Sequence, residues 1–160
     1  MDRVRKSLGT LLRPDRVVDL APGETKRDVV HRLGVLTCRA AAVHGDHEKA
    51  VLDALWDRET ILSTGIGLGM AVPHVRHSNV ATEAMFVGRS AAGLAFDAID
   101  GKPVHAVFTI LLTRRIVRSS RIRAKHSSRK FREVQLVLLL LIHFSTAVTK
   151  VGRVNSLRTI

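Results

Sequence analysis

An alternating run of glycines, "STGIGLGMAVPH" at residues 63–74, constrains this chain more than any other stretch of its sequence. Glycine adopts positive φ without strain and lets a backbone approach a neighbour closely, so the run predicts a loop between regular elements. Pro73 restricts its own φ and pushes Val72 towards an extended conformation. The side chain of His74 is therefore presented on a stiff support at the end of a Gly-rich loop.

Two helices are predicted before this loop. Residues 24–38 place apolar side chains at helical spacing, and Thr25 with Asp28 three residues later forms a weak capping box. Residues 44–59 carry a second apolar stripe, with Asp46 as the residue expected to cap its start. No internal repeat interrupts this pattern.

Strands are predicted after the loop. Residues 83–91 have the composition of a short strand, and the turn-rich residues 93–103 link it to a near-continuous apolar run at 104–113. That run has strand length and many β-branched residues, which is typical of a strand buried on both faces. Helices followed by strands predict an α/β layered domain.

The positive charge of the chain is confined to its C-terminal part. Of the net charge of +12, residues 1–113 contribute +1, from 14 Lys and Arg against 13 Asp and Glu. Residues 114–160 contribute +11, from 12 Lys and Arg against a single acid, Glu133. We therefore predict a domain over residues 1–113 and an atypical basic tail over residues 114–160.

Three interpretations of this tail stay open. The abrupt rise in arginine where a strand stops favours the end of the same domain, altered by a shifted reading frame or by gene degradation. A basic arm that binds nucleic acid or an acidic partner is the second interpretation, and a helix pair that completes the domain is the third. Phe131 and Phe144 are the only aromatic residues of the tail, so specific nucleic-acid binding through stacking is not expected.

Cysteine content and hydropathy indicate the compartment. The single cysteine, Cys38, cannot form an internal disulfide, which fits a reducing cytosol. The charged N-terminus lacks the apolar core of a secretory signal, and no clean apolar stretch of about 18 residues is present. We expect a cytoplasmic protein without a membrane span.

The residues around His74 suit phosphoryl transfer. Backbone N–H groups of a Gly-rich loop can cradle an anion, hydroxyl groups add donors, and an arginine offers fork geometry to a phosphate. Imidazole is a competent nucleophile near neutral pH, and such transfer depends mainly on positioning and charge stabilisation. The candidate residues are His74 as nucleophile, Arg58 as phosphate partner, and Ser63, Thr64, Gly65, Gly67 and Gly69 as the phosphate-binding loop. From these residues alone, a tight turn without a ligand is the alternative.

The segment "RETILSTGIGLGMAVPH", residues 58–74, resembles the active-site signature of a known family. It matches the pattern R-E-x-x-x-S-T-G-x-G-x-G-x-A-x-P-H of the type-2 EIIA domains of the bacterial phosphoenolpyruvate-dependent sugar phosphotransferase system, the fructose, mannitol and nitrogen-regulatory group. "FDAIDGKPV", residues 96–104, is similar to a turn and strand of the same family. The resemblance covers residues 15–113.

This resemblance implies a three-layer α/β/α domain with a mixed central sheet and a phosphotransferase activity through phosphohistidine. His74 would accept phosphate from the phosphocarrier protein HPr, with Arg58 near that phosphate and with Thr64 and the glycines around it. The family uses no metal and no bound cofactor. Glu59 is expected to act as a cap or to pair near Arg58 and not as a general base, since the transfer needs none.

Two features of the family are not readable in this chain. The family carries a second histidine after its last strand, and His126 is the one histidine in the corresponding region. The helices that close the family's fold are not evident in the basic tail.

Two functions compete within the family. In sugar uptake, phosphate passes from His74 to a downstream EIIB-type transporter domain. In nitrogen-type regulation, the phosphorylation state of His74 controls binding to a regulatory target. Outside the family, a basic nucleic-acid-binding protein and a non-functional relic are the remaining hypotheses.

Overall fold

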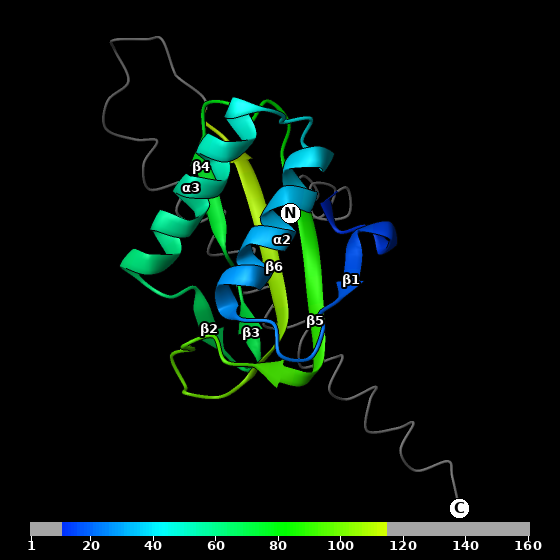
Figure 1. Ribbon diagram of the computed structural model, residues 1–160. Coiled ribbons are helices and arrows are strands. Elements are labelled where there is room, and N and C mark those ends of the chain that lie inside the picture. The colour runs from blue at the N-terminus through cyan, green and yellow to red at the C-terminus, as the bar shows by residue number, and fades with distance from the viewer. Residues whose placement is uncertain (1–10, 115–160) are drawn as a thin grey trace, which may run out of the picture. The chain divides into compact units, whose positions relative to one another are not determined.

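A mixed sheet of six strands carries the fold in this computed structural model, which describes residues 11–114 (Figure 1). The elements in chain order are η1 (Pro14–Arg16), β1 (Val17–Asp19), α2 (Lys26–Ala40), α3 (Asp46–Ile61), β2 (Gly65–Gly67), β3 (Met70–Ala71), β4 (His74–His77), β5 (Ala84–Leu94) and β6 (Val104–Thr113). The strand order is β1-β5-β6-β3-β2, and β4 also pairs with β6. The pairs β5·β6 and β2·β3 are antiparallel, whereas β1·β5, β3·β6 and β4·β6 are parallel.

The start of α2 is capped as the sequence predicts. The hydroxyl of Thr25 accepts the Asp28 N–H, and the Asp28 carboxylate accepts the Thr25 N–H in return. These two bonds confirm the predicted capping box. Gly34 is unfavourable inside a helix, but a Cβ there would come within 2.6 Å of Leu52 Cδ2. Glycine at this position therefore lets α2 and α3 pack closely.

The helix α3 covers the second predicted helical segment but begins differently. Gly45, with a φ of +60°, occupies the N-cap position and provides no side-chain hydrogen bond. Asp46 is the first helical residue instead, so the prediction that Asp46 caps the helix is wrong. Its carboxylate still lies in the first turn, where the helix dipole favours negative charge.

Both helices lie on one face of the sheet (Figure 1). Their buried side chains pack against Val107 and Leu111 of β6. Because side chains alternate along a strand, Ile110 lies on the opposite face, where it is buried opposite Met85 of β5. The strand β6 is therefore buried on both faces, as its apolar run predicts.

The Gly-rich segment forms a hairpin rather than an open loop. A two-residue turn, Leu68–Gly69, joins β2 to β3, and the φ angles of these residues are +56° and +75°. Positive φ at both central residues is the signature of a type I′ turn, whose twist matches that of a hairpin. The prediction of a loop across residues 63–74 is therefore wrong for its middle, because these glycines serve strand pairing and the turn.

The hairpin is anchored to the segment between β5 and β6. A Cβ on Gly65 would lie 2.7 Å from Ala98 Cα, so glycine is required for the two backbones to approach. At the hairpin tip, the Leu68 N–H donates to the Asp100 carboxylate at 2.9 Å. This hydrogen bond holds the pKa of the Asp100 carboxyl below its ordinary value. The hairpin that leads to His74 is thus held at both its base and its tip.

The α/β class and the mixed sheet are confirmed within the described residues. The helical layer expected after the last strand and His126 lie outside residues 11–114, and the boundary predicted between 1–113 and 114–160 stays a prediction. In the part of the chain that the structure describes, no helix is long and apolar enough to cross a bilayer.

Candidate functional site

His74 opens strand β4 and lies on the face of the sheet that the helices do not cover. The strands β3 and β4 follow one another beside β6, and between them the Pro73 carbonyl accepts the Ile110 N–H at 2.9 Å. Val75 packs into the core beneath α2 and α3. Because side chains alternate along a strand, His74 and Arg76 lie on the opposite face. The side chain of His74 is half-buried there.

One hydrogen bond orients the imidazole of His74. Its Nδ1 lies 2.9 Å from the carbonyl oxygen of Val72. A carbonyl oxygen can only accept, so Nδ1 carries the proton, and in the neutral ring Nε2 then holds the lone pair. Pro73 stiffens the backbone between the two residues. The geometry therefore leaves the lone pair of the neutral ring on Nε2.

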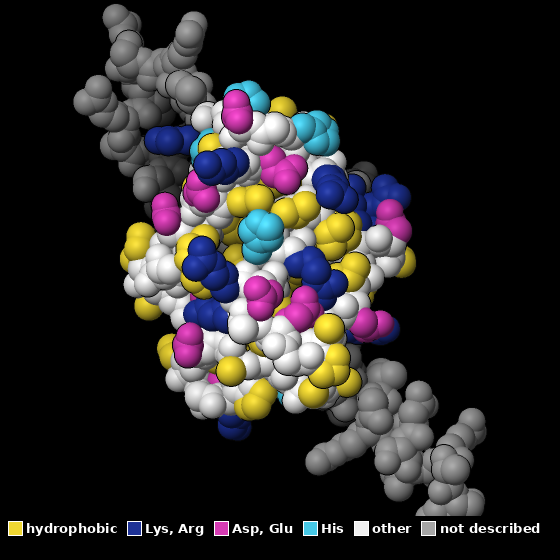
Figure 2. Space-filling model, in the orientation of Figure 1, with side chains coloured by type: hydrophobic (Ala, Val, Ile, Leu, Met, Phe, Trp, Pro, Cys, Tyr) yellow, Lys and Arg dark blue, Asp and Glu magenta, His cyan; other side chains and the backbone are white. Residues whose placement is uncertain are grey.

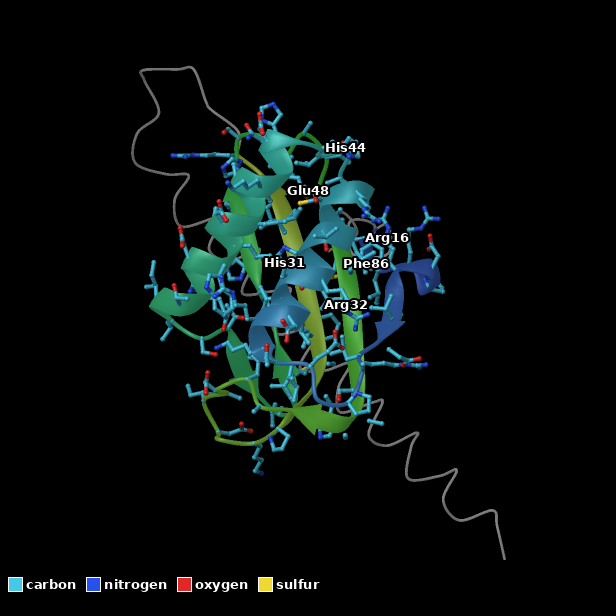
Figure 3. The ribbon with its side chains drawn as sticks, viewed as in Figure 1. Arg16, His31, Arg32, His44, Glu48 and Phe86 are labelled. Atoms are coloured by element: carbon cyan, nitrogen blue, oxygen red, sulfur yellow. The ribbon has the colours of Figure 1, made fainter. Side chains whose placement is uncertain are left out.

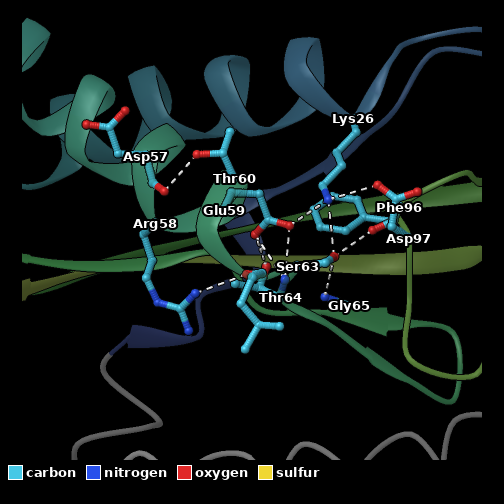
Figure 4. A network of polar contacts seen from close by, with 11 residues as sticks. Lys26, Asp57, Arg58, Glu59, Thr60, Ser63, Thr64, Gly65, Phe96 and Asp97 are labelled. Carbon is cyan, nitrogen blue, oxygen red and sulfur yellow. Dashed lines mark hydrogen bonds and ion pairs between the residues drawn. The ribbon is translucent and has the colours of Figure 1, made fainter.

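Thr64 connects the start of the hairpin to the end of α3. Its N–H donates to both carboxylate oxygens of Glu59, at 2.9 and 3.1 Å, and its hydroxyl donates to Oε2 (Figure 4). The Thr64 carbonyl accepts the Val72 N–H at 3.0 Å. A chain of hydrogen bonds thus leads from Glu59 through Thr64 and Val72 to His74.

Lys26 supplies the counter-charge for Glu59. Its Nζ lies 2.8 Å from Glu59 Oε1, 3.1 Å from Ser63 Oγ and 3.2 Å from Asp97 Oδ2 (Figure 4). The Glu59 side chain is only 1% exposed, and a carboxylate buried so deeply requires a cationic partner. The Glu59 carboxylate therefore accepts from Thr64, beyond the end of α3, and the pairing expected near Arg58 is made instead by Lys26 from α2.

Arg58 extends towards the end of its own helix. Its Nη1 donates to the Leu62 carbonyl oxygen at 3.0 Å (Figure 4). This bond satisfies one of the carbonyl groups that a helix leaves open at its C-terminus. A guanidinium has several further N–H donors, so the contact leaves others for an anion. The role of Arg58 at a phosphate stays a prediction.

The loop predicted to bind phosphate already has partners inside the protein. The Ser63 hydroxyl donates to the Phe96 carbonyl oxygen at 2.8 Å and accepts the Gly65 N–H at 3.3 Å. Thr64 gives both of its donors to Glu59. Phosphate binding stays a prediction for the whole set: Ser63, Thr64, Gly65, Gly67 and Gly69.

Lys26 is the residue of this network that the sequence pattern missed. It stands 37 residues before Ser63, and periodicity carries no information about such distant contacts. One signal was present, because Lys26 occupies the first position of α2. A cation there meets the positive end of the helix dipole, so a nearby anionic partner is expected.

A groove on the outer side of α2 and α3 is separate from His74. It has a volume of about 470 Å³, and its lining includes Arg27, His31, Glu48, Lys49, Asp53 and Trp56. His31 and Glu48 project from the two helices in Figure 3. Figure 2 shows basic and acidic side chains mixed around hydrophobic ones on this face, so no single sign of charge dominates it. Within residues 11–114, no group of three or more His, Cys, Asp or Glu side chains could hold a metal ion.

Comparisons with known proteins identify relatives of this chain. Residues 10–120 match the family model described as "Phosphoenolpyruvate-dependent sugar phosphotransferase system, EIIA 2". The fructose-specific EIIA component of Haloferax volcanii is 38% identical over 91 residues, which are 57% of this chain and 58% of that protein. A nitrogen regulatory protein of Pseudomonas aeruginosa is 32% identical over 105 residues, which are 66% of this chain and 67% of that protein.

Solved structures share the same fold. Nitrogen regulatory protein IIA-Ntr from Neisseria meningitidis aligns with a TM-score of 0.64 and 26% identity, over 96% of this chain and 92% of that one. IIA mannitol from Escherichia coli aligns with a TM-score of 0.54 and 19% identity, over 65% of this chain and 73% of that one, which supports the fold alone. The family model covers more than half of the chain, and the active-site signature lies inside the matched range. The chain therefore belongs to the type-2 EIIA family of the phosphoenolpyruvate-dependent sugar phosphotransferase system.

Proposed function

We propose that this chain is a phosphotransferase that takes a phosphoryl group from the phosphocarrier HPr onto Nε2 of His74 and passes it to a partner protein. The observation that supports this most is the hydrogen bond from His74 Nδ1 to the Val72 carbonyl oxygen, at 2.9 Å. It places the proton of the neutral ring on Nδ1 and leaves the Nε2 lone pair for phosphorus. Family membership supports HPr as the donor.

The transfer requires one bond to form and one to break. The Nε2 lone pair attacks phosphorus in line with its bond to the carrier, a nitrogen–phosphorus bond forms, and the carrier keeps the electron pair of the broken bond. The ring becomes more positive as the new bond forms, and the Nδ1–H bond to Val72 stabilises that charge. No proton has to leave Nδ1, so the step needs no general base.

Cationic side chains would stabilise the phosphoryl oxygens. Arg76 lies on the same face of the sheet as His74 and is exposed to solvent. Arg58 stands at the end of α3, which packs against β4. Planar guanidinium groups match phosphate geometry, so we assign Arg58 to the phosphoryl group, as the family signature implies.

The partner that receives the phosphate is, in our first proposal, an EIIB-type transporter domain of a sugar uptake system. Regulation is the second candidate. It is favoured by the similarity to IIA-Ntr over 96% of this chain and by the Pseudomonas aeruginosa relative, a nitrogen regulatory protein. Loss of sugar uptake on gene deletion would support the first role, whereas unchanged uptake with altered nitrogen or potassium physiology would support the second.

Phosphate uptake by the purified chain tests the transfer itself. The chain is mixed with phosphoenolpyruvate, the first enzyme of the system and HPr, beside a His74→Ala variant. We expect an acid-labile, alkali-stable phosphate on the wild type and none on the variant. A folded wild-type chain that takes up no phosphate would contradict both the transport role and the regulatory role.

A further inference from the structure

We propose that Glu59, neutralised by Lys26, is a positioning residue that keeps the Val72 carbonyl oxygen available to the imidazole of His74. This inference rests on the proposed function, because it concerns the preparation of the same histidine. Glu59 and Lys26 would act through the hairpin backbone and would not touch the phosphoryl group.

The β2–β3 hairpin departs from a regular ladder at its open end. Gly65 pairs with Ala71, so Thr64 stands opposite Val72. The bond from the Val72 N–H to the Thr64 carbonyl is present at 3.0 Å, which makes this a hydrogen-bonded pair. Such a pair in antiparallel strands normally exchanges two hydrogen bonds. The second bond, from the Thr64 N–H to the Val72 carbonyl, is absent from the described hairpin.

The two groups of the missing bond, the Thr64 N–H and the Val72 carbonyl, instead form hydrogen bonds with Glu59 and His74. The Thr64 N–H donates to the Glu59 carboxylate at 2.9 Å, and the Val72 carbonyl accepts from His74 Nδ1 at 2.9 Å. Each partner therefore replaces one half of the same backbone bond. While Glu59 holds the Thr64 amide, no backbone donor competes with the imidazole for the Val72 oxygen.

The charge of Glu59 explains why it holds the Thr64 amide. A carboxylate is a stronger acceptor than a backbone carbonyl, and here it also accepts the Thr64 hydroxyl. Lys26, at 2.8 Å, provides the counter-charge that a buried carboxylate needs. Lys26 is the first residue of α2, where the positive end of the helix dipole disfavours a cation. The contact with Glu59, rather than helix stability, therefore accounts for a lysine at this position.

Removing the Glu59 carboxylate should release this arrangement. The Thr64 N–H is then expected to turn to the Val72 carbonyl and complete the ladder. The Thr64 N–H then competes with the imidazole of His74 for the Val72 carbonyl oxygen, and the proton of the ring can move from Nδ1 to Nε2. A neutral ring with its proton on Nε2 has no lone pair there with which to attack phosphorus.

The tautomer of His74 tests this inference without any phosphate. Nitrogen–proton correlation spectra of the isotope-labelled full chain distinguish a proton on Nδ1 from one on Nε2. We expect the Nδ1–H form in the wild type and a shift towards Nε2–H in Glu59→Ala. Glu59→Gln retains an oxygen for the Thr64 N–H and should restore the Nδ1–H form. The initial rate of phosphate uptake by Glu59→Ala should fall about 10- to 100-fold.

Glu24→Ala is the matched control. Glu24 forms an ion pair with Arg32 of α2 at 2.8 Å and accepts the Ala21 N–H, and neither contact involves the hairpin. This variant should leave both the His74 tautomer and the uptake rate unchanged. An unchanged His74 spectrum in folded Glu59→Ala would overturn the inference, and so would an equal shift in Glu24→Ala.

Glu59→Asp keeps the test decisive if Glu59→Ala does not fold. It retains the charge for Lys26, but the shorter side chain draws the carboxylate away from the Thr64 N–H. We expect a tautomer shift in the same direction, and a wild-type spectrum would overturn the inference. Failure of the proposed function is a separate result: wild-type protein that takes up no phosphate defeats that function, whereas the tautomer comparison still decides the role of Glu59.

Discussion

Two ion pairs in this protein share their chemistry but not their surroundings. Lys26 and Glu59 meet beneath the hairpin, with side chains 17% and 1% exposed. Arg89 and Asp19 meet on the surface of the sheet, with side chains 67% and 73% exposed. Buried charges lose their hydration, so removing one partner leaves the other with a large penalty. Exposed charges keep their hydration, so their mutual attraction contributes little to the free energy of unfolding.

The difference indicates what each pair does. Asp19 lies opposite Arg89 in the parallel pairing of β1 and β5, so this contact serves one local register. Lys26 and Glu59 join the start of α2 to the end of α3, and through Thr64 they reach the hairpin beside His74. Of the two pairs, the buried one is therefore placed to influence both global stability and the imidazole of His74.

The largest effect is expected when the buried pair loses its cation. Lys26→Met leaves the Glu59 carboxylate buried without a counter-charge and should lower the free energy of unfolding by about 3–5 kcal/mol. Urea denaturation at neutral pH measures this, with Arg89→Met as the control at the exposed pair. Equal losses in the two variants would show that burial does not distinguish the pairs.

Replacing both members of the buried pair should separate stability from positioning. Lys26→Met with Glu59→Leu removes both charges, and hydrophobic replacement of a buried ion pair is often neutral. The Thr64 hydroxyl loses its acceptor, so we expect an unfolding free energy between those of Lys26→Met and the wild type. Phosphate uptake should nevertheless stay low, because the Thr64 N–H is no longer held away from Val72. Recovery of stability and uptake together would contradict the positioning role.

Local signals were sufficient to predict the helices and the central strand. The capping box of Thr25 and Asp28 depends on two residues that are three positions apart, and the continuous apolar run of β6 predicts a buried strand. These features need no knowledge of distant contacts. The family resemblance placed His74 in the candidate site in the same way, through a contiguous signature.

Contacts between distant segments were not predictable from the pattern. Alternating glycines suit an anion-binding loop and a type I′ hairpin equally well, because both need positive φ. The choice is made by strand pairing and by the approach of Gly65 to Ala98, which lies in another part of the sequence. The proton position on His74 likewise depends on where the Val72 carbonyl points, which only the folded geometry shows.

Cys38 shows what burial does to a group without a counter-charge, and it provides the next prediction. Burial, with a smaller contribution from the charge of Glu48, raises the pKa of this thiol from 9.0 to about 11. The folded pKa exceeds the unfolded one, so the contribution of Cys38 to stability is constant below about pH 9 and declines as the pH rises towards about 11. Urea denaturation across this range, compared between wild type and Cys38→Ala, measures the decline. Parallel stability curves for the two proteins would refute it.

The exposed pair should give the smallest effect. The hydrogen bond from Arg89 holds the pKa of the Asp19 carboxyl below its ordinary value. Because the pKa of Asp19 is lower in the folded state than in the unfolded state, Asp19 contributes to the free energy of unfolding at a pH above its unfolded-state pKa. This contribution is lost as the pH falls through the folded-state pKa. In Arg89→Gln, the pKa of Asp19, measured by NMR titration, should return to its ordinary range. The thermal midpoint at neutral pH should hardly change. Added salt should weaken the pKa shift in the wild type, because water and ions reach both charges. A loss of stability as large as that of Lys26→Met would mean that the surface pair, too, supports the fold, and the contrast between the two pairs would fail.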